Sequence, residues 1–320
     1  MEEVTTPVDP KRAPKWRRYA IYFFAAVGLL LSVLIGVAAL GGKSAPPVLS
    51  FDQGEIIEKV MARNYGKYSE SERGWLYVDE ATKLTYLVTV VQQKKVDGND
   101  GEELYFVTSG RSLNSPNETD SFYGVFQVSW NNGQLLEFGD ARRPSGVNPV
   151  TPDRVLFEAL SADVWGWVVK VKDLEISDGS VLDSTSNVVL APYDNGIAVL
   201  AEFYGAFNIV GAGSCEETER LHASWKQAQG QPKSAPAEGE ANAMSPEEQA
   251  DDNIEPPRCT RLQWTYRTDP PADLSFTPLY ITRKAGMRNG DPVAAKTWKV
   301  LFDPKSHTYL LPKELKDVAA

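Results

Sequence analysis

The stretch Phe126-Gln-Val-Ser-Trp-Asn-Asn-Gly-Gln-Leu-Leu-Glu-Phe138 decides the fold. Two runs of apolar and β-forming residues flank Asn131, Asn132 and Gly133. An Asn-Gly pair accepts the positive φ angles of a type I′ turn, whose twist matches that of paired strands. The stretch therefore predicts an antiparallel β-hairpin.

Similar pairs recur between apolar runs, at Asp178-Gly179, Asn195-Gly196 and Asn289-Gly290. Residues 75–78, 84–91, 104–108, 298–302 and 308–311 also have the composition of strands joined by short turns. Several hairpins at this spacing predict a mainly β domain with antiparallel strands. A sandwich, an open sheet and a propeller-like arrangement all fit this pattern.

Three short helices are predicted between the strands. Residues 53–65 place apolar side chains at helical spacing. A Thr-Pro pair predicts a second helix over residues 151–160, because threonine suits the N-cap and proline the first helical position. Ser214 and Glu217 have the spacing of a capping box, which opens a third helix over residues 214–227.

Residues 19–42 form a run of 24 residues without a charge. At about 1.5 Å per residue, a helix of this length reaches roughly 36 Å, enough to cross a hydrocarbon core of about 30 Å. Apart from Tyr19 at its start, only Tyr22 and Ser32 carry polar side-chain groups, so the helix has no face for water. The run predicts one transmembrane helix.

The flanking charges predict the orientation of this helix. The tail before it carries Lys11, Arg12, Lys15, Arg17 and Arg18, and the charges after it are sparse. Such a bias keeps the N-terminus in the cytoplasm and exports the remainder. The prediction is a single-pass protein of a cell inner membrane, with a C-terminal domain that is periplasmic or otherwise extracytoplasmic.

The competing interpretation is a cleavable signal peptide. Ala39-Leu40-Gly41 has the small residues of a cleavage site. The apolar run is longer than the roughly 7–15 residues usual for such a peptide, which favours retention.

Gly28, Ser32 and Gly36 recur every four residues and share one face of the predicted membrane helix. Small residues at this spacing let two helices approach closely, so they predict a helix–helix seam, with a second copy or another protein. Glycine and alanine are also common in membrane helices without such a contact.

The exported part is acidic, with 28 Lys and Arg against 40 Asp and Glu, a net charge of −12. We expect no nucleic-acid partner, because binding to phosphates requires clustered Lys and Arg. No basic stripe is evident that departs from this average.

Cys215 and Cys259 are the only cysteines, and an even pair in an oxidising compartment predicts a disulfide. Residues 229–257 between them are rich in Pro, Ala, Glu, Asp and Gln. Such a segment buries too little apolar surface to fold, and it predicts a disordered acidic insertion. The disulfide would then join the ordered residues at its two ends.

The predicted organisation follows from these features. It comprises a basic cytoplasmic tail (1–18), a transmembrane helix (19–42), a linker (43–52), a β-rich exported domain (53–228 and 258–320) and the acidic insertion (229–257).

Residues that suit catalysis are few. His222 and His307 fall on a predicted helix and in a hairpin turn, where side chains are usually exposed. Residues 97–103 gather carboxylates without the spacing of a calcium loop, so no metal or cofactor is predicted. Six tryptophans fall on predicted strands, where core packing is a commoner role than a ligand platform: Trp75, Trp130, Trp165, Trp167, Trp264 and Trp298.

These features favour a non-catalytic, membrane-anchored β domain that serves as an assembly or interaction subunit of a bacterial-type envelope complex for secretion or transfer. Its expected partners are the membrane and other envelope proteins. The alternative is an anchored, carboxylate-dependent hydrolase of envelope glycans or peptides, which requires a concave, acid-lined pocket. A third possibility is a solute-binding module with tryptophans lining its site.

Overall fold

The computed structural model describes residues 50–115, 120–177, 180–211, 213–230, 255–256 and 258–316. The predicted membrane helix, its small residues Gly28, Ser32 and Gly36, and most of the acidic insertion lie outside this part of the chain. Among the described residues, no helix is both long and apolar enough to cross a membrane. What is described is mainly β with antiparallel pairing, as the sequence predicts.

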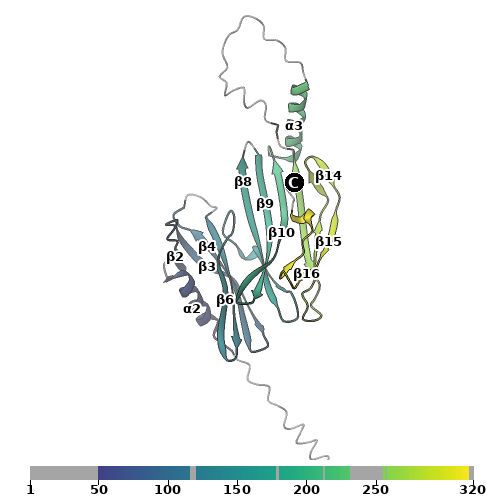
Figure 1. Ribbon diagram of the computed structural model, residues 1–320. Helices are drawn as coiled ribbons and strands as arrows, with labels where there is room; N and C mark the ends of the chain where they lie inside the picture. Colours follow the sequence, from purple (N-terminus) through teal and green to yellow (C-terminus); the bar gives the residue numbers. More distant parts are fainter. Residues whose placement is uncertain are drawn as a thin grey trace, which may run out of the picture. The chain divides into compact units, whose positions relative to one another are not determined.

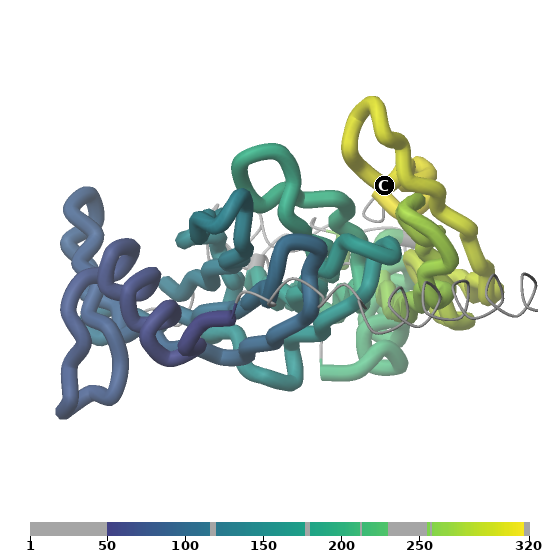
Figure 2. Tube along the Cα trace, turned by 90° about the horizontal axis from the view of Figure 1, so that it is seen from below, coloured from purple at the N-terminus to yellow at the C-terminus, as the bar shows by residue number. Residues whose placement is uncertain are grey.

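The first sheet is a six-stranded antiparallel meander (Figure 1). Its strands pair in chain order: β1 (Tyr68–Ser69), β2 (Gly74–Val78), β3 (Thr85–Asp97), β4 (Glu102–Ser112), β5 (Ser121–Asn131) and β6 (Gln134–Pro144). Neighbours in the sheet are neighbours in the chain, and the tube along these residues runs from blue to teal (Figure 2). The turn between β5 and β6 has φ angles of 50° at Asn132 and 77° at Gly133, which confirms the predicted hairpin.

Both faces of this sheet are covered, so its central strands have no solvent side. Leu104 and Phe106 of β4 pack with helix α2 (Gln53–Tyr65), which has the predicted bounds. Tyr105 and Val107, the alternate residues, pack into a second core. This alternation of two apolar sets explains why seven consecutive residues of β4 are buried.

The second sheet has nine strands, in the order β14-β13-β11-β10-β9-β8-β7; β12 also pairs with β11, and β15 pairs with β12. Their bounds are β7 (Val155–Ala159), β8 (Trp165–Ser177), β9 (Ser180–Tyr193), β10 (Gly196–Val210), β11 (Thr260–Thr268), β12 (Leu279–Arg283), β13 (Gly286–Arg288), β14 (Asp291–Val293) and β15 (Lys296–Val300).

The two sheets pack face to face, which selects the sandwich among the three predicted arrangements. Tyr105 and Val107 of the first sheet share one core with Trp167 and Val169 of the second. Trp165 packs against the same core, as expected for tryptophans two residues apart on one strand. Core packing is therefore the role of this pair.

A third core lies where the C-terminal strands meet the second sheet. Strand β11 pairs with β10 through its first residues and with β12 through its last, so it belongs to both arrangements. Buried residues of β8–β11 pack there with residues of β12, β15 and the closing elements β16 (Phe302–Asp303), β17 (Thr308–Tyr309) and α4 (Lys313–Lys316). The course of β11 thus decides where the C-terminal strands lie.

The prediction of a helix over residues 151–160 is wrong. A 3₁₀ turn, Pro152–Arg154, is followed directly by strand β7. The Thr151 hydroxyl donates to Asp153 Oδ1 at 2.7 Å and does not cap a helix. Pairing with β8 overrides the local signal, because it buries Val155 in the core between the sheets.

Two further turns are informative. The turn before β14 has positive φ at Asn289 and Gly290, as predicted. The β9–β10 turn lies one residue earlier than predicted, because Tyr193 pairs with Gly196 across Asp194 and Asn195. Asp178-Gly179 lies outside the described residues.

Replacing Gly124 of β5 by valine should lower the free energy of unfolding by about 1–3 kcal/mol, the usual cost of overpacking. A Cβ at Gly124 would lie 2.8 Å from the Ala141 carbonyl oxygen and 2.6 Å from Thr108 Oγ1. The buried Tyr65 hydroxyl bonds both groups and is crowded as well. Urea unfolding measures the change.

Gly196→Ala is the matched control for this prediction, since a Cβ there meets nothing within 4 Å. It should change stability by less than about 0.5 kcal/mol. Equal effects of the two substitutions would contradict the packing of α2 on the first sheet.

Candidate interaction surface

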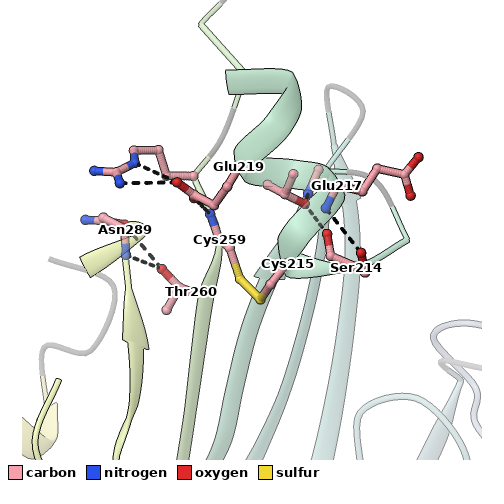
Figure 3. The surroundings of a disulfide bond; sticks show 10 residues. Ser214, Cys215, Glu217, Glu219, Cys259, Thr260 and Asn289 are labelled. Atoms are coloured by element: carbon pink, nitrogen blue, oxygen red, sulfur yellow. Dashed lines mark hydrogen bonds and ion pairs between the residues drawn. A yellow bond between two sulfur atoms is a disulfide. The ribbon is translucent and has the colours of Figure 1, made fainter. Parts of the chain in front are cut away.

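The start of β11 is held by a disulfide to helix α3 (Cys215–Gly230). Cys215 lies in the first turn of α3 and Cys259 directly precedes β11, with their Cα atoms 5.2 Å apart (Figure 3). The pairing is the one that the sequence predicts. Ser214 Oγ accepts from the Glu217 N–H at 3.2 Å, which gives α3 the predicted N-cap.

A carboxylate adds a second link between α3 and β11. Glu219 accepts the Cys259 N–H at 2.8 Å and pairs with the Arg258 guanidinium at 3.2 Å (Figure 3). Partial burial opposes ionisation of Glu219, but these hydrogen bonds outweigh it and lower the pKa of the carboxyl group. Thr260 and Asn289 join the next residues of β11 to the β13–β14 turn.

With its start fixed, β11 alternates between core and solvent. Leu262 and Trp264 are buried in the third core. The alternate residues are exposed, and they are polar or basic: Arg261, Gln263, Thr265 and Arg267. Strands β12 and β15 extend this outward side beyond β11.

Cross-strand pairing arranges the outward residues in rows. In one row Arg267, Tyr280 and Lys299 stand side by side. The guanidinium carbon of Arg267 lies 4.0 Å from the Tyr280 ring centroid, and Lys299 Nζ lies 5.9 Å from it. These cation–π contacts hold two cations around one aromatic ring.

The next row consists of hydroxyl groups. Thr265 pairs with Thr282, and Thr282 pairs with Thr297, whose Oγ1 lies 2.9 Å from that of Thr282. Lys284 continues the line of outward residues on the chain after β12, next to Gln263. We define the basic face as these outward residues of the three strands: Arg261, Gln263, Thr265, Arg267, Tyr280, Thr282, Lys284, Thr297 and Lys299.

The basic face carries cations without a carboxylate of its own. Asp269 lies beside it and accepts from Arg267 Nη1 at 2.7 Å. Hydrogen bonds from Tyr280 and from Arg267 lower the pKa of Asp269, so this carboxylate stays ionised. Residues 258–316 as a whole contain eleven Lys and Arg against five Asp and Glu, a net charge of +6 in a chain of net charge −10.

Sequence reasoning missed this surface because it averaged charge over the exported part. A count restricted to residues 258–316 would have found the excess of cations. The grouping of Arg267, Tyr280 and Lys299 depends on the pairing of three strands. No sequence signal gives that register.

The two histidines lie in different elements. His222 of α3 is only 5% exposed and its Nε2 lies 3.0 Å from Glu255 Oε1, so the expected exposure is wrong. The disulfide and Glu219 set the rotation of α3, which turns Thr218 and His222 inward and leaves Leu221 exposed. His307 lies in the β16–β17 turn as expected, with Nε2 2.5 Å from the Tyr193 hydroxyl.

The acidic turn at residues 97–103 is occupied by internal contacts. Glu102 accepts from Lys95 Nζ at 2.6 Å, and Glu103 accepts from the Tyr105 hydroxyl at 2.6 Å and from Gln127. Within the described part of the chain, no three His, Cys, Asp or Glu side chains gather as metal ligands would.

In comparisons with protein-family models, with curated proteins and with solved structures, the chain matches none.

Proposed function

We propose that the protein is a non-catalytic, membrane-tethered β domain that acts as an assembly subunit of an envelope complex, and that its basic face binds an acidic segment of a partner protein. The observation that carries the proposal is the row of Arg267, Tyr280 and Lys299, with both cations exposed, in an otherwise acidic protein. Complementary charge of this kind steers association and selects partners.

The sequence supplies the tether. Residues 19–42 have the length and apolarity of a transmembrane helix, and the basic tail favours a cytoplasmic N-terminus. The cysteine pair at disulfide distance fits an oxidising compartment.

The chemistry of the basic face suits binding. It offers guanidinium and ammonium groups, hydroxyl groups and one aromatic ring, which recognise carboxylates and acidic peptides. Three paired strands hold the backbone of these residues at fixed spacing, so binding a partner requires no rearrangement of the backbone. Rigid presentation of this kind is typical of an assembly surface.

The hydrolase alternative has one observation in its favour. A hollow of about 420 Å³ between α2 and the first strands is lined by Glu58 and Glu70, beside Tyr68 and Trp75. Both glutamates are exposed, whereas a glycosidase acid needs an apolar environment that raises its pKa. We therefore retain the assembly subunit as the proposal.

Reversing three charges should abolish partner capture. In the full-length tagged chain, extracted from its own membranes in mild detergent, Arg267→Glu, Lys284→Glu and Lys299→Glu together place carboxylates opposite an acidic partner. Like charges at an interface cost several kcal/mol, so the retained partner should fall more than about 100-fold. Quantitative mass spectrometry of the captured proteins measures the loss.

The matched control reverses Lys67, Lys94 and Lys226, which are exposed on other parts of the chain. It should retain the partner, and added salt should weaken capture by the unmodified chain. An unchanged partner set in the basic-face variant, with an unchanged melting temperature, would exclude this face. Capture of no partner by the unmodified chain would overturn the assembly proposal itself.

A further inference from the structure

A groove opens where β11 leaves the second sheet. The β10–β11 ladder ends at the pair Ala206 and Gln263, next to an irregularity at Gly205 in the β9–β10 pairing. Beyond this point β11 pairs with β12 instead of β10, so β10 and β11 diverge. The space between them encloses about 330 Å³ and is lined by residues of β7–β11. This volume is at the lower end of the range for small-molecule sites, about 300–1,000 Å³.

The groove is lined by an amide whose polar atoms keep access to it. Asn187 of β9 is 3% exposed, and its side chain forms no hydrogen bond with the residues that the structure describes. A Cβ at Gly205 would lie 2.9 Å from Asn187 Nδ2, so glycine leaves room beside the amide. The Asn187 amide faces the groove with both a donor and an acceptor free, so a ligand in the groove can bond both.

A cation stands beside this amide. Lys170 of β8 pairs in register with Asn187, and both line the groove. Directly opposed residues of two strands have Cβ atoms roughly 5 Å apart, so one ligand can reach both. Lys170 forms no ion pair with any carboxylate in the described ranges, whereas Lys172, two residues on, pairs with Asp183 at 3.6 Å.

Aromatic side chains line the opposite side of the groove. Trp264 and Tyr266 come from β11 beyond the point where it leaves β10. The Tyr266 hydroxyl makes a long hydrogen bond of 3.4 Å to Glu158 Oε1. The groove thus combines aromatic surface, an amide that both donates and accepts, the Thr185 hydroxyl, and an ammonium group.

We infer that this groove binds one acidic sugar residue of a glycan, such as a hexuronate. The apolar C–H surface of a pyranose ring would pack on the partly exposed Tyr266, next to the nearly buried Trp264. Its hydroxyl groups would bond the Asn187 amide, and its carboxylate would pair with Lys170. The site lies on different residues from the basic face, apart from Thr265, and it does not depend on the proposed assembly role.

The test titrates the full-length chain in detergent with glucuronate and with glucose, read by tryptophan fluorescence and by calorimetry. Glucuronate should bind at least about tenfold more tightly than glucose, since one charge-assisted hydrogen bond discriminates by roughly this factor. Lys170→Met should remove the preference, and Asn187→Leu should weaken both sugars. Lys172→Met, the matched control, should leave both affinities unchanged.

Two outcomes would overturn the inference. One is equal affinity for the two sugars in the unmodified chain. The other is an absence of binding at 20-fold above the roughly millimolar Kd expected for a single sugar. Because Asn187→Leu could lower stability, Gly205→Ala provides an independent variant that fills the groove from the other side. Binding that persists in a folded Gly205→Ala protein would equally contradict the site.

Discussion

Replacing Trp167 by alanine should lower the free energy of unfolding by about 3–5 kcal/mol, the range observed for large aromatic residues removed from cores. Trp167 is 1% exposed and lies in the core between the two sheets. Its ring centroid is 4.6 Å from that of Phe157, so its removal also ends an aromatic contact. Urea unfolding followed by circular dichroism measures the loss.

The matched control for this change is Leu174→Ala on the same strand. Leu174 is 43% exposed, so its truncation should cost less than about 0.5 kcal/mol. If Trp167→Ala were as mild as Leu174→Ala, the two sheets would not share one core. The sandwich arrangement would then have to be abandoned.

Replacing Cys215 and Cys259 together by serine should lower the free energy of unfolding by about 4 kcal/mol. The two cysteines are 44 residues apart in sequence, and closing a loop of that length restricts the unfolded chain by roughly this amount in the chain-entropy model. The loss should also loosen the start of β11, because Cys259 directly precedes that strand. Thermal unfolding with and without reductant measures both effects.

Reductant provides the internal control for the disulfide. The unmodified chain should lose stability when reduced, and the double serine variant should be insensitive to the same treatment. Two free thiols in the denatured, unreduced protein would contradict the disulfide. An identical melting temperature for the oxidised and reduced chain would contradict its stabilising role.

The parts of the fold set by local chemistry could be predicted from sequence. The hairpin at Asn132 and Gly133 depends on two residues that accept positive φ, and its structure is the predicted one. Helix α2 depends on apolar spacing, and the N-cap of α3 on Ser214. Each of these signals is local, because it depends on residues that are close together in the sequence.

The parts of the fold that depend on pairing between distant segments could not be predicted from sequence. A Thr-Pro signal at residues 151–160 suggests a helix, but the neighbouring strand β8 offers a ladder, and β7 forms instead. The choice of a sandwich over a propeller depends on which faces of β4 and β8 meet, and alternation alone does not specify that. The burial of His222 also depends on a distant residue, because the disulfide from Cys215 to Cys259 positions its helix.

Both functional surfaces depend on the course of β11. The basic face needs Arg267, Tyr280 and Lys299 in one row, and the groove needs β11 to leave β10 at Gln263. No sequence motif marks either the alignment of these three residues or the point where β11 leaves β10. Regional charge does leave a signal in the sequence, because residues 258–316 are basic within an acidic chain.

Site-specific photo-crosslinking in intact membranes tests the proposed interaction surface most directly. A photoreactive amino acid at position 282, in the middle row of the basic face, should give a covalent adduct with a protein that presents an acidic segment. The same group at position 94, on β3, should not give that adduct, and the Arg267, Lys284 and Lys299 reversals should remove it. An adduct that forms equally from both positions, or no adduct from position 282, would contradict the assignment of the basic face.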